Sequence, residues 1–176
     1  MIDVSGPMSG DECRAEPFAE HLRDALRAAC AEDGDIWSIF ANNFGPDGFD
    51  ASINLYVDNP RNCTFVLFDG DDLAGMSSFL GIDPDRGVLE IGGTYYRPHL
   101  RGTGFNRRVK DMMLTRAFDC GFRRIEFRVD ARNTRSQAAM AGLDATREGV
   151  MRADRITWTS HIRDTVLFSI LRDEWR

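Results

Sequence analysis

Residues 88–106 have the sequence VLEIGGTYYRPHLRGTGFN, in which an apolar run leads through a glycine-bearing loop into an amphipathic segment. The run Val88–Tyr96 predicts a strand. Apolar side chains then recur at helical spacing from Phe105 to Phe118, which predicts a helix with Arg107, Arg108 and Lys110 outside the apolar stripe. Backbone N–H groups at the start of a helix have no internal partner and carry partial positive charge. The loop 97–104 therefore predicts an anion site.

Two common nucleotide-binding fingerprints do not fit this loop. A dinucleotide fingerprint requires a third glycine after Gly102 and Gly104, but Arg107 stands there. A P-loop requires Gly-Lys before Ser or Thr, and Lys110, the one lysine of the chain, follows Val109. A tight turn without a ligand is the structural alternative for the two glycines.

The remaining elements follow from the same patterns. We expect helices over 17–31, 49–57 and 134–143, and strands over 63–68, 73–82, 124–129, 147–153 and 165–171. This order predicts a layered α/β fold whose second half contains a strand–helix–strand crossover. Because no linker, repeat or low-complexity tract interrupts the chain, we expect one domain over 1–176.

Charge is unevenly divided along the chain. Residues 1–96 hold 5 basic and 18 acidic side chains, whereas residues 97–176 hold 17 and 10, which together give the net charge of −6. The acidic half predicts a negative cleft for a cationic amine, although composition bias is an alternative, since 21 of the 22 basic residues are arginine. The overall acidity and the absence of a nucleic-acid motif argue against nucleic acid as a partner.

Composition also argues against a membrane protein, a secreted protein and a metal-binding protein. No apolar run approaches the ~20 residues that span a bilayer, so no membrane partner is expected. The first residues lack the pattern of a secretory signal, and we expect a cytoplasmic protein. The four cysteines are far apart and only three histidines are present, which predicts free thiols and no metal site.

The loop and four further stretches resemble one known family. Residues 101–106, RGTGFN, resemble the acetyl-CoA loop of the GCN5-related N-acetyltransferase (GNAT) family, whose pattern is Arg/Gln-x-x-Gly-x-Gly/Ala. The same loop and four further stretches resemble, more narrowly, the RimJ/RimL-type protein N-acetyltransferase branch. The four are LEIGGTYYRP (89–98), NTRSQAA (133–139), REGVMR (147–152) and RDTVLFSI (163–170). The resemblance spans residues 64–175 and implies the GNAT fold, a central, mixed, mostly antiparallel, splayed β-sheet flanked by helices. Asn106 and Asp144 depart from the family, which usually has Gly or Ala at the first position and Gly at the second.

The resemblance implies acetyl-CoA as cosubstrate and no metal. Its pyrophosphate would lie on the backbone amides of Arg101, Gly102, Gly104, Phe105 and Asn106. Its pantetheine arm would pair with the strand backbone near Thr94 and Tyr96, and Asn133 joins these cofactor-binding candidates. The pair Gly92-Gly93 within a strand predicts a slot for this arm, with an ordinary β-bulge as the alternative.

Two side chains are candidates for proton transfer. Strand alternation places Glu90 on the same face as Gly92 and Thr94, and partial burial would raise its pKa and suit a general base. A water relay, or a Glu facing solvent at a strand edge, is the alternative. The resemblance implies that Ser136 protonates the departing thiolate, while Asn133 and Ser136 also fit a purely structural helix cap.

These observations predict an acetyl-CoA-dependent N-acyltransferase. The acceptor would be a primary amine, either a protein N-terminal α-amine or a small amine metabolite, which attacks directly in a ternary complex. The alternative is a catalytically inactive coenzyme A-binding sensor or partner module. By analogy with the family, we expect a homodimer through the C-terminal strands.

Overall fold

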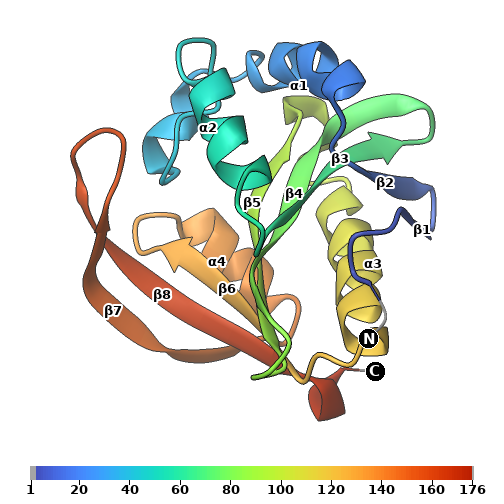
Figure 1. The fold of residues 1–176 in the computed structure, drawn as a ribbon. Coiled ribbons are helices and arrows are strands. Elements are labelled where there is room, and N and C mark those ends of the chain that lie inside the picture. The colour runs from blue at the N-terminus through green and yellow to red at the C-terminus, as the bar shows by residue number, and fades with distance from the viewer. Residues whose placement is uncertain (1–2, 176) are drawn as a thin grey trace.

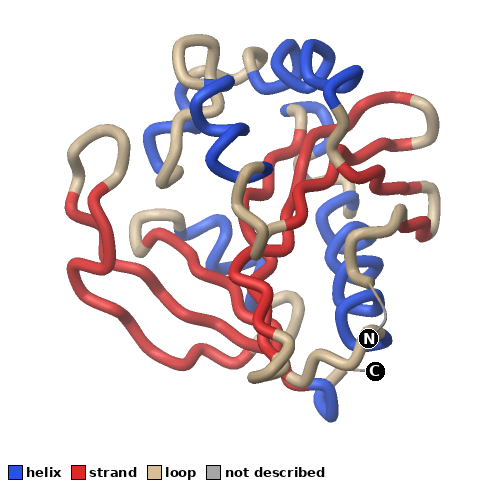
Figure 2. Tube along the Cα trace, viewed as in Figure 1, coloured by secondary structure: helices blue, strands red, loops and turns tan. Residues whose placement is uncertain are grey.

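The computed structural model describes residues 3–175 and contains one eight-stranded sheet in the order β1-β2-β3-β4-β5-β6-β8-β7 (Figures 1 and 2). Neighbouring strands are antiparallel except for the parallel pair β5–β6. The strands are β1 (Met8–Gly10), β2 (Cys13–Pro17), β3 (Cys63–Asp69), β4 (Asp72–Asp83), β5 (Val88–Tyr96), β6 (Arg124–Asp130), β7 (Thr146–Ile156) and β8 (Ile162–Leu171). The helices are α1 (Arg23–Cys30), α2 (Phe49–Val57), α3 (Phe105–Asp119) and α4 (Thr134–Ala141).

Helices cover both faces of the sheet, so the molecule has two apolar cores. Helices α1 and α2 lie over one face, and α3 and α4 over the other (Figure 1). The first core includes Leu26, Trp37, Phe49, Ile53 and Tyr95. The second is larger and includes Phe65, Phe79, Phe105, Val109 and Phe127. The layered α/β fold with a mostly antiparallel, splayed sheet is thereby confirmed. No helix among residues 3–175 has the length and apolar composition to cross a bilayer.

The N-terminal region differs from its sequence pattern. The predicted helix over 17–31 is only partly right, because α1 covers 23–30 and a short 3-10 helix, Glu20–Leu22, precedes it. Pro17 instead ends β2, whose residues Cys13–Pro17 pair with Asp69–Phe65 of β3. The hairpin β1–β2 was not expected, since its first strand is three residues long and depends on pairing rather than on local propensity.

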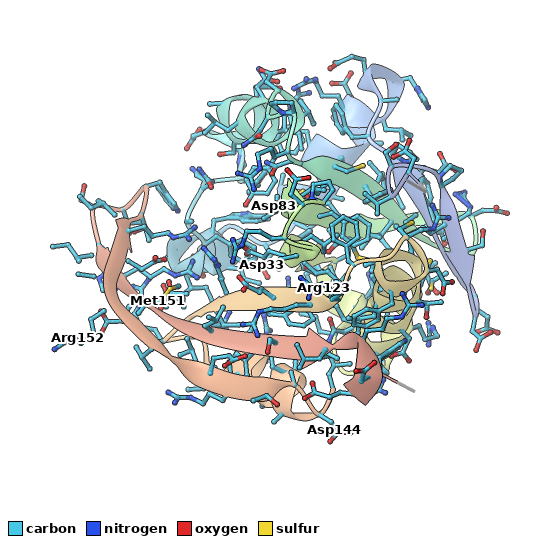
Figure 3. All side chains as sticks on the ribbon, turned by 60° about the horizontal axis from the view of Figure 1, so that its bottom comes forward. Asp33, Asp83, Arg123, Asp144, Met151 and Arg152 are labelled. Carbon is cyan, nitrogen blue, oxygen red and sulfur yellow. The ribbon has the colours of Figure 1, made fainter. Side chains whose placement is uncertain are left out.

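Asp144 confirms the expected turn after α4. Its φ is 56°, the left-handed conformation that the family usually assigns to glycine and that Asp tolerates better than most residues. Figure 3 labels Asp144 at the lower edge of the molecule. In the same view, Met151 and Arg152 lie on the outer strand β7, where Arg152 is exposed.

Strand β5 contains a bulge at Gly93 and Thr94. Ser78 of β4 is opposite Gly92 and Met76 is opposite Tyr95, so Ser77 alone faces both intervening residues. The extra residue reverses the alternation of side chains beyond it.

The bulge corrects one prediction. Leu89 and Ile91 belong to the α3 core, so Glu90 points to the α2 face. Thr94 accepts a hydrogen bond from Lys110 of α3, so it points to the other face. Glu90 and Thr94 therefore lie on opposite faces of the sheet, and the prediction of a shared face was wrong.

The sheet opens into a wedge between β5 and β6. These strands pair only over Val88–Glu90 and Arg124–Glu126, although each continues for several residues. The divergence begins at Glu90, immediately before the bulge. Polar backbone groups of both strands are thereby left beside an open slot.

Substitution of Gly93 by alanine tests how much the bulge contributes to stability. Its φ is +57°, and an added Cβ would come within 2.5 Å of Cε1 of Tyr56. Gly81 has the same conformation, with φ of +56°, and open space around its Cβ position. Both alanine variants therefore suffer the left-handed strain of about 1–2 kcal/mol. We expect Gly93→Ala to lose at least ~1 kcal/mol more than Gly81→Ala in urea unfolding, because of the clash. Equal losses would show that Tyr56 does not constrain the bulge.

Candidate active site

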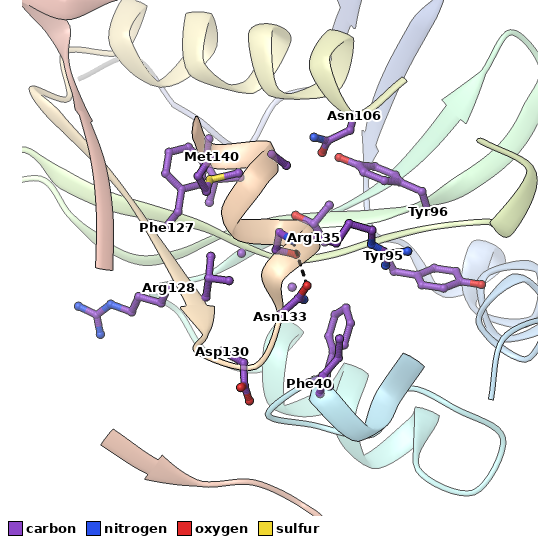
Figure 4. A pocket seen from close by; sticks show the side chains of 18 of the residues that line it. Phe40, Tyr95, Tyr96, Asn106, Phe127, Arg128, Asp130, Asn133, Arg135 and Met140 are labelled. Carbon is purple, nitrogen blue, oxygen red and sulfur yellow. Dashed lines mark hydrogen bonds between the residues drawn. The ribbon is translucent and has the colours of Figure 1, made fainter. Parts of the chain in front are cut away.

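A pocket of about 490 Å³ passes through the wedge between β5 and β6. It begins at the loop before α3, runs beside the start of α4 and reaches the 3-10 helix Asp35–Ile39 on the opposite side. Figure 4 shows Tyr96 and Asn106 at one end of this pocket and Phe40 and Asp130 at the other. The tip of the β7–β8 hairpin is held close by Trp158, whose Nε1 donates to the Trp37 carbonyl at 2.8 Å.

The loop before α3 presents unpaired backbone donors. Gly102 and Gly104 have φ of +79° and +86°, which turns the chain sharply into the helix. The amides of Gly102, Gly104 and Asn106 have no hydrogen-bond partner within residues 3–175, and the Phe105 amide has only a long 3.4 Å contact with Thr103 Oγ1. Arg101 differs from the prediction, since its amide already donates to the Pro98 carbonyl at 3.2 Å.

The Arg101 side chain holds this loop in place. Its guanidinium pairs with Asp33 and donates to the Tyr96 carbonyl from Nε at 3.2 Å and from Nη2 at 3.0 Å. It therefore fastens the loop both to the end of β5 and to the segment after α1. Arg101 thus supports the anion site through its side chain, and the Tyr96 carbonyl is occupied by that contact.

Glu90 lines the pocket at the narrow end of the wedge. Its side chain keeps 20% of its surface exposed, and Oε2 lies 3.5 Å from Nε of Arg128. Burial raises the pKa of Glu90, while the charges of Arg128, Arg155 and Arg163 oppose that rise. The expected raised pKa of this carboxyl is present, and the alternative of a fully solvated strand-edge Glu is not.

Asn133 and Ser136 form the start of α4. Asn133 Oδ1 accepts the backbone N–H of Ser136 at 3.0 Å, so the expected N-cap is present (Figure 4). This cap uses the backbone of Ser136, and the serine itself lines the pocket. The structural role and a role in proton transfer are therefore compatible, because they use different atoms.

Lys110 is a pocket residue that the sequence pattern missed. It was expected outside the apolar stripe of α3, but it is 3% exposed and lies one helical turn before Met113 on the buried side. Its Nζ donates to Thr94 Oγ1 at 2.8 Å, and Thr94 Oγ1 lies 2.7 Å from Ser77 Oγ. Burial lowers the pKa of Lys110 to about 7, against the opposing charge of Glu90. Its being the sole lysine of the chain was the one available signal.

The charges around the pocket differ from the expected negative cleft. Glu90 is the one acidic residue from the first half of the chain among the pocket residues that the structure describes, and Asp130 comes from the second half. The basic pocket residues are more numerous: Arg101, Arg107, Lys110, Arg128, Arg135, Arg155 and Arg163. The acidic half therefore does not form an anionic pocket, because its side chains lie mostly on outer surfaces.

Comparisons with known proteins agree on the family. Residues 26–143, about two thirds of the chain, match the model of the acetyltransferase (GNAT) family. A structure from Chromobacterium violaceum, assigned to the same family, is 28% identical, with a TM-score of 0.89 over 97% of this chain and 88% of its own. No curated protein matches this sequence.

More distant structures share the fold alone. The ribosomal-protein-S5-alanine acetyltransferase of Vibrio fischeri is 16% identical, with a TM-score of 0.76 over 97% of this chain and 98% of its own. The spermidine N-acetyltransferase of Vibrio cholerae, solved with CoA and spermine, is 15% identical, with a TM-score of 0.76 over 93% and 98%. At these identities, neither narrows the family to a branch or an acceptor.

The buried amine of Lys110 predicts a pH-dependent stability. In the unfolded chain the amine stays charged up to its usual pKa of 10.5, whereas the folded amine is neutral above about 7. Unfolding therefore binds a proton between these values, and stability gains from rising pH across this window. Lys110→Met removes the cost of the buried charge. We expect the variant to exceed the parent by a few kcal/mol below pH 7, since each pKa unit is worth about 1.4 kcal/mol, and by much less at pH 10.

Urea unfolding between pH 6 and pH 10 measures this difference. Thr94→Val is the matched control, because it removes the hydrogen-bond acceptor and keeps the amine. Its stability should retain the pH dependence of the parent. A gap between Lys110→Met and the parent that is constant from pH 6 to pH 10 would contradict the lowered pKa.

Proposed function

Because this chain belongs to the acetyltransferase (GNAT) family, we propose that it transfers an acetyl group from acetyl-CoA to a primary amine that attacks directly in a ternary complex. The observation that carries the proposal is the wedge pocket, which joins a loop of free backbone amides at one end to a half-buried carboxylate, Glu90, in its middle. Acetyl transfer from acetyl-CoA to an amine uses a site for the phosphates of acetyl-CoA and a base that deprotonates the amine. The pocket connects these two places.

The anionic end of acetyl-CoA would bind at the loop before α3. The amides of Gly102, Gly104 and Asn106 are unpaired, and the start of α3 adds partial positive charge. The Phe105 amide is available because its contact with Thr103 is long. Arg101 contributes by holding the loop. These features fit a pyrophosphate, which needs N–H donors rather than particular side chains.

The pantetheine arm would follow the opened edge of β5. The bulge at Gly93 and Thr94 and the divergence from β6 leave room for it beside the strand. Asn133, at the start of α4, lines the other side of the same passage. Thr94 is fixed by its bonds to Lys110 and Ser77, which keeps this part of the strand rigid. Tyr96 offers its ring, packed edge-on against Phe105, rather than its occupied carbonyl.

Glu90 would act as the general base and Ser136 as the general acid. The raised pKa of Glu90 favours accepting a proton from the ammonium group of the acceptor, which leaves a neutral amine to attack. The amine nitrogen then bonds to the acetyl carbon as the carbon–sulfur bond breaks. The thiolate of coenzyme A leaves and takes a proton from the Ser136 hydroxyl, and the proton that the new amide nitrogen releases restores that hydroxyl through solvent. Glu90 and Ser136 line the same pocket, as these successive proton transfers require.

The RimJ/RimL-type branch remains the proposed subfamily, because five stretches of the sequence match it. Acceptors differ within the wider fold, which includes a ribosomal-protein-S5-alanine acetyltransferase and a spermidine N-acetyltransferase from two Vibrio species. For this chain, a protein N-terminal α-amine and a small amine metabolite are both proposed acceptors. A homodimer through β7 and β8 and a cytoplasmic location also remain predictions. The alternative function is a coenzyme A-binding sensor without turnover.

Glu90→Gln tests the enzymatic proposal. We expect the variant to lower kcat at neutral pH about 10²-fold or more, because the amide does not accept the proton, with acetyl-CoA affinity nearly unchanged. Thiol release from acetyl-CoA with an amine panel measures turnover, and calorimetry measures affinity. Glu148→Gln is the matched control, since Glu148 lies on β7 outside the pocket.

Three results separate the alternatives. Loss of turnover in Glu90→Gln but not in Glu148→Gln supports the base. Unchanged kcat in Glu90→Gln rejects that role. Acetyl-CoA binding by the parent without thiol release, whichever amine is supplied, favours the sensor.

A further inference from the structure

Arg163 is a buried guanidinium without a close counter-ion. The residue is 5% exposed and lines the pocket, where Nη2 donates to the Arg128 carbonyl at 3.0 Å. Its Nε is buried and has no hydrogen-bond partner within the described chain. The nearest carboxylate oxygen in an ion pair with it, Oδ2 of Asp130, is 4.0 Å from Nε, beyond hydrogen-bond distance. A buried charge is costly unless it is paired, so this arrangement requires an explanation.

The neighbouring arginines differ from Arg163 because each has a carboxylate of its own. Arg132 donates three hydrogen bonds to the Asp130 carboxylate, from its backbone N–H, Nε and Nη2, at 2.9, 3.0 and 2.8 Å. Arg155 Nε bonds Asp154 at 2.8 Å. The other two pairs are Arg128 with Glu126 at 3.0 Å and Arg124 with Glu148 at 2.7 Å. The carboxylate nearest to Arg163 is therefore already engaged by Arg132.

Arg155 reinforces the positive charge at this point. Arg155 of β7 and Arg163 of β8 are direct cross-strand partners, and both line the pocket. Like charges in directly opposite positions destabilise a sheet. Burial and the charge of Arg155 both lower the pKa of Arg163, which still remains protonated at neutral pH. An anion between these two side chains and the pocket would relieve the repulsion.

This positive region adjoins the base. The charges of Arg155 and Arg163 act on Glu90, and they also act on the Tyr56 hydroxyl beside the bulge. One molecule can therefore approach Glu90 with one end and the arginine pair with the other. Asp130 and Asp154 are the remaining acidic groups near the pair, and both are engaged by other residues.

We propose that the acyl acceptor is an amine that also carries a carboxylate, which Arg155 and Arg163 bind while the amine faces Glu90. This inference rests on the proposed acetyltransferase function and narrows its substrate class. Arginine suits the role because its planar guanidinium matches a carboxylate. The apolar residues Ile36, Ile39 and Phe40 line the same end of the pocket and fit an apolar side chain on the acceptor.

Matched acid and amide acceptors test the inference. The probes are L-leucine, L-methionine and L-phenylalanine, each beside its carboxamide, with β-alanine and 4-aminobutyrate and their amides to vary the spacing. Thiol release from acetyl-CoA gives kcat/KM for each. We expect at least one acid to exceed its amide by about tenfold or more, because the amide lacks the charge that the arginine pair recognises. Amide activity equal to or above that of every acid overturns the proposal.

Two variants connect the preference to the arginine pair. Arg155→Gln and the more conservative Arg163→Lys should reduce the acid-to-amide ratio about tenfold, through a higher KM for the acid. An arginine substitution that also alters Glu90 changes kcat/KM for the acid and the amide alike, and this common effect cancels in the acid-to-amide ratio. Arg152→Gln is the matched control, because Arg152 is exposed on the same strand outside the pocket. A ratio that Arg155→Gln leaves unchanged in a folded protein overturns the proposal, whatever Arg163→Lys does to folding.

The test separates this inference from the function on which it rests. Acetylation of amines with no preference for a carboxylate leaves the acetyltransferase function in place and overturns the inference alone. Absence of both acetyl-CoA binding and thiol release with every probe overturns both. To measure acceptor binding without turnover, the tryptophan fluorescence of CoA-saturated Glu90→Gln protein can be titrated with the preferred acid and with its amide. Equal affinities would contradict the proposed carboxylate contact.

Discussion

The structure depends on one local constraint, the extra residue that β5 inserts opposite Ser77 just where β6 separates from it. Before this point β5 is an ordinary strand between β4 and β6. After it, the strand keeps its antiparallel partner, changes the faces of its side chains and leaves its other edge free. Gly93 permits the change, since an added Cβ would collide with Tyr56. The pocket, the exposed strand edge and the placement of Glu90 and Thr94 on opposite faces all follow from this arrangement.

Electrostatics divides the pocket into parts with different roles. At the start of α3, charge comes from backbone dipoles, which need no counter-ion and suit a phosphate. In the middle, the pKa of the half-buried Glu90 is raised and the pKa of the buried Lys110 is lowered. At the far end, Arg163 has no carboxylate within hydrogen-bond distance and lies opposite Arg155, so positive charge is in excess there. This distribution favours an acceptor with a negative group over a polycation.

The sequence predicted most elements of the fold because their patterns are local. The strand 88–96, the helix from Phe105 and the cap at Asn133 depend on residues close in the chain, and all are present. Glu90 and Ser136 both line the pocket, and their catalytic roles remain proposals. Features that depend on distant partners were missed. Strand β2 exists because it pairs with β3, and Lys110 is buried because α3 packs over the bulge. Arg155 and Arg163 are neighbours only because of the register in which β7 pairs with β8. Short stretches of sequence that resemble a family do not reveal this register.

The central claim is that the wedge and its loop bind coenzyme A, and a thermal-shift comparison tests it most directly. The protein would be heated alone and with acetyl-CoA, coenzyme A, ATP or NAD. At ligand about 100-fold above Kd, binding adds about 2.7 kcal/mol, which corresponds to about 5–10 °C in Tm for a chain of this size. The account predicts such a shift with acetyl-CoA and coenzyme A and not with NAD or ATP. No shift with either coenzyme A compound would contradict it.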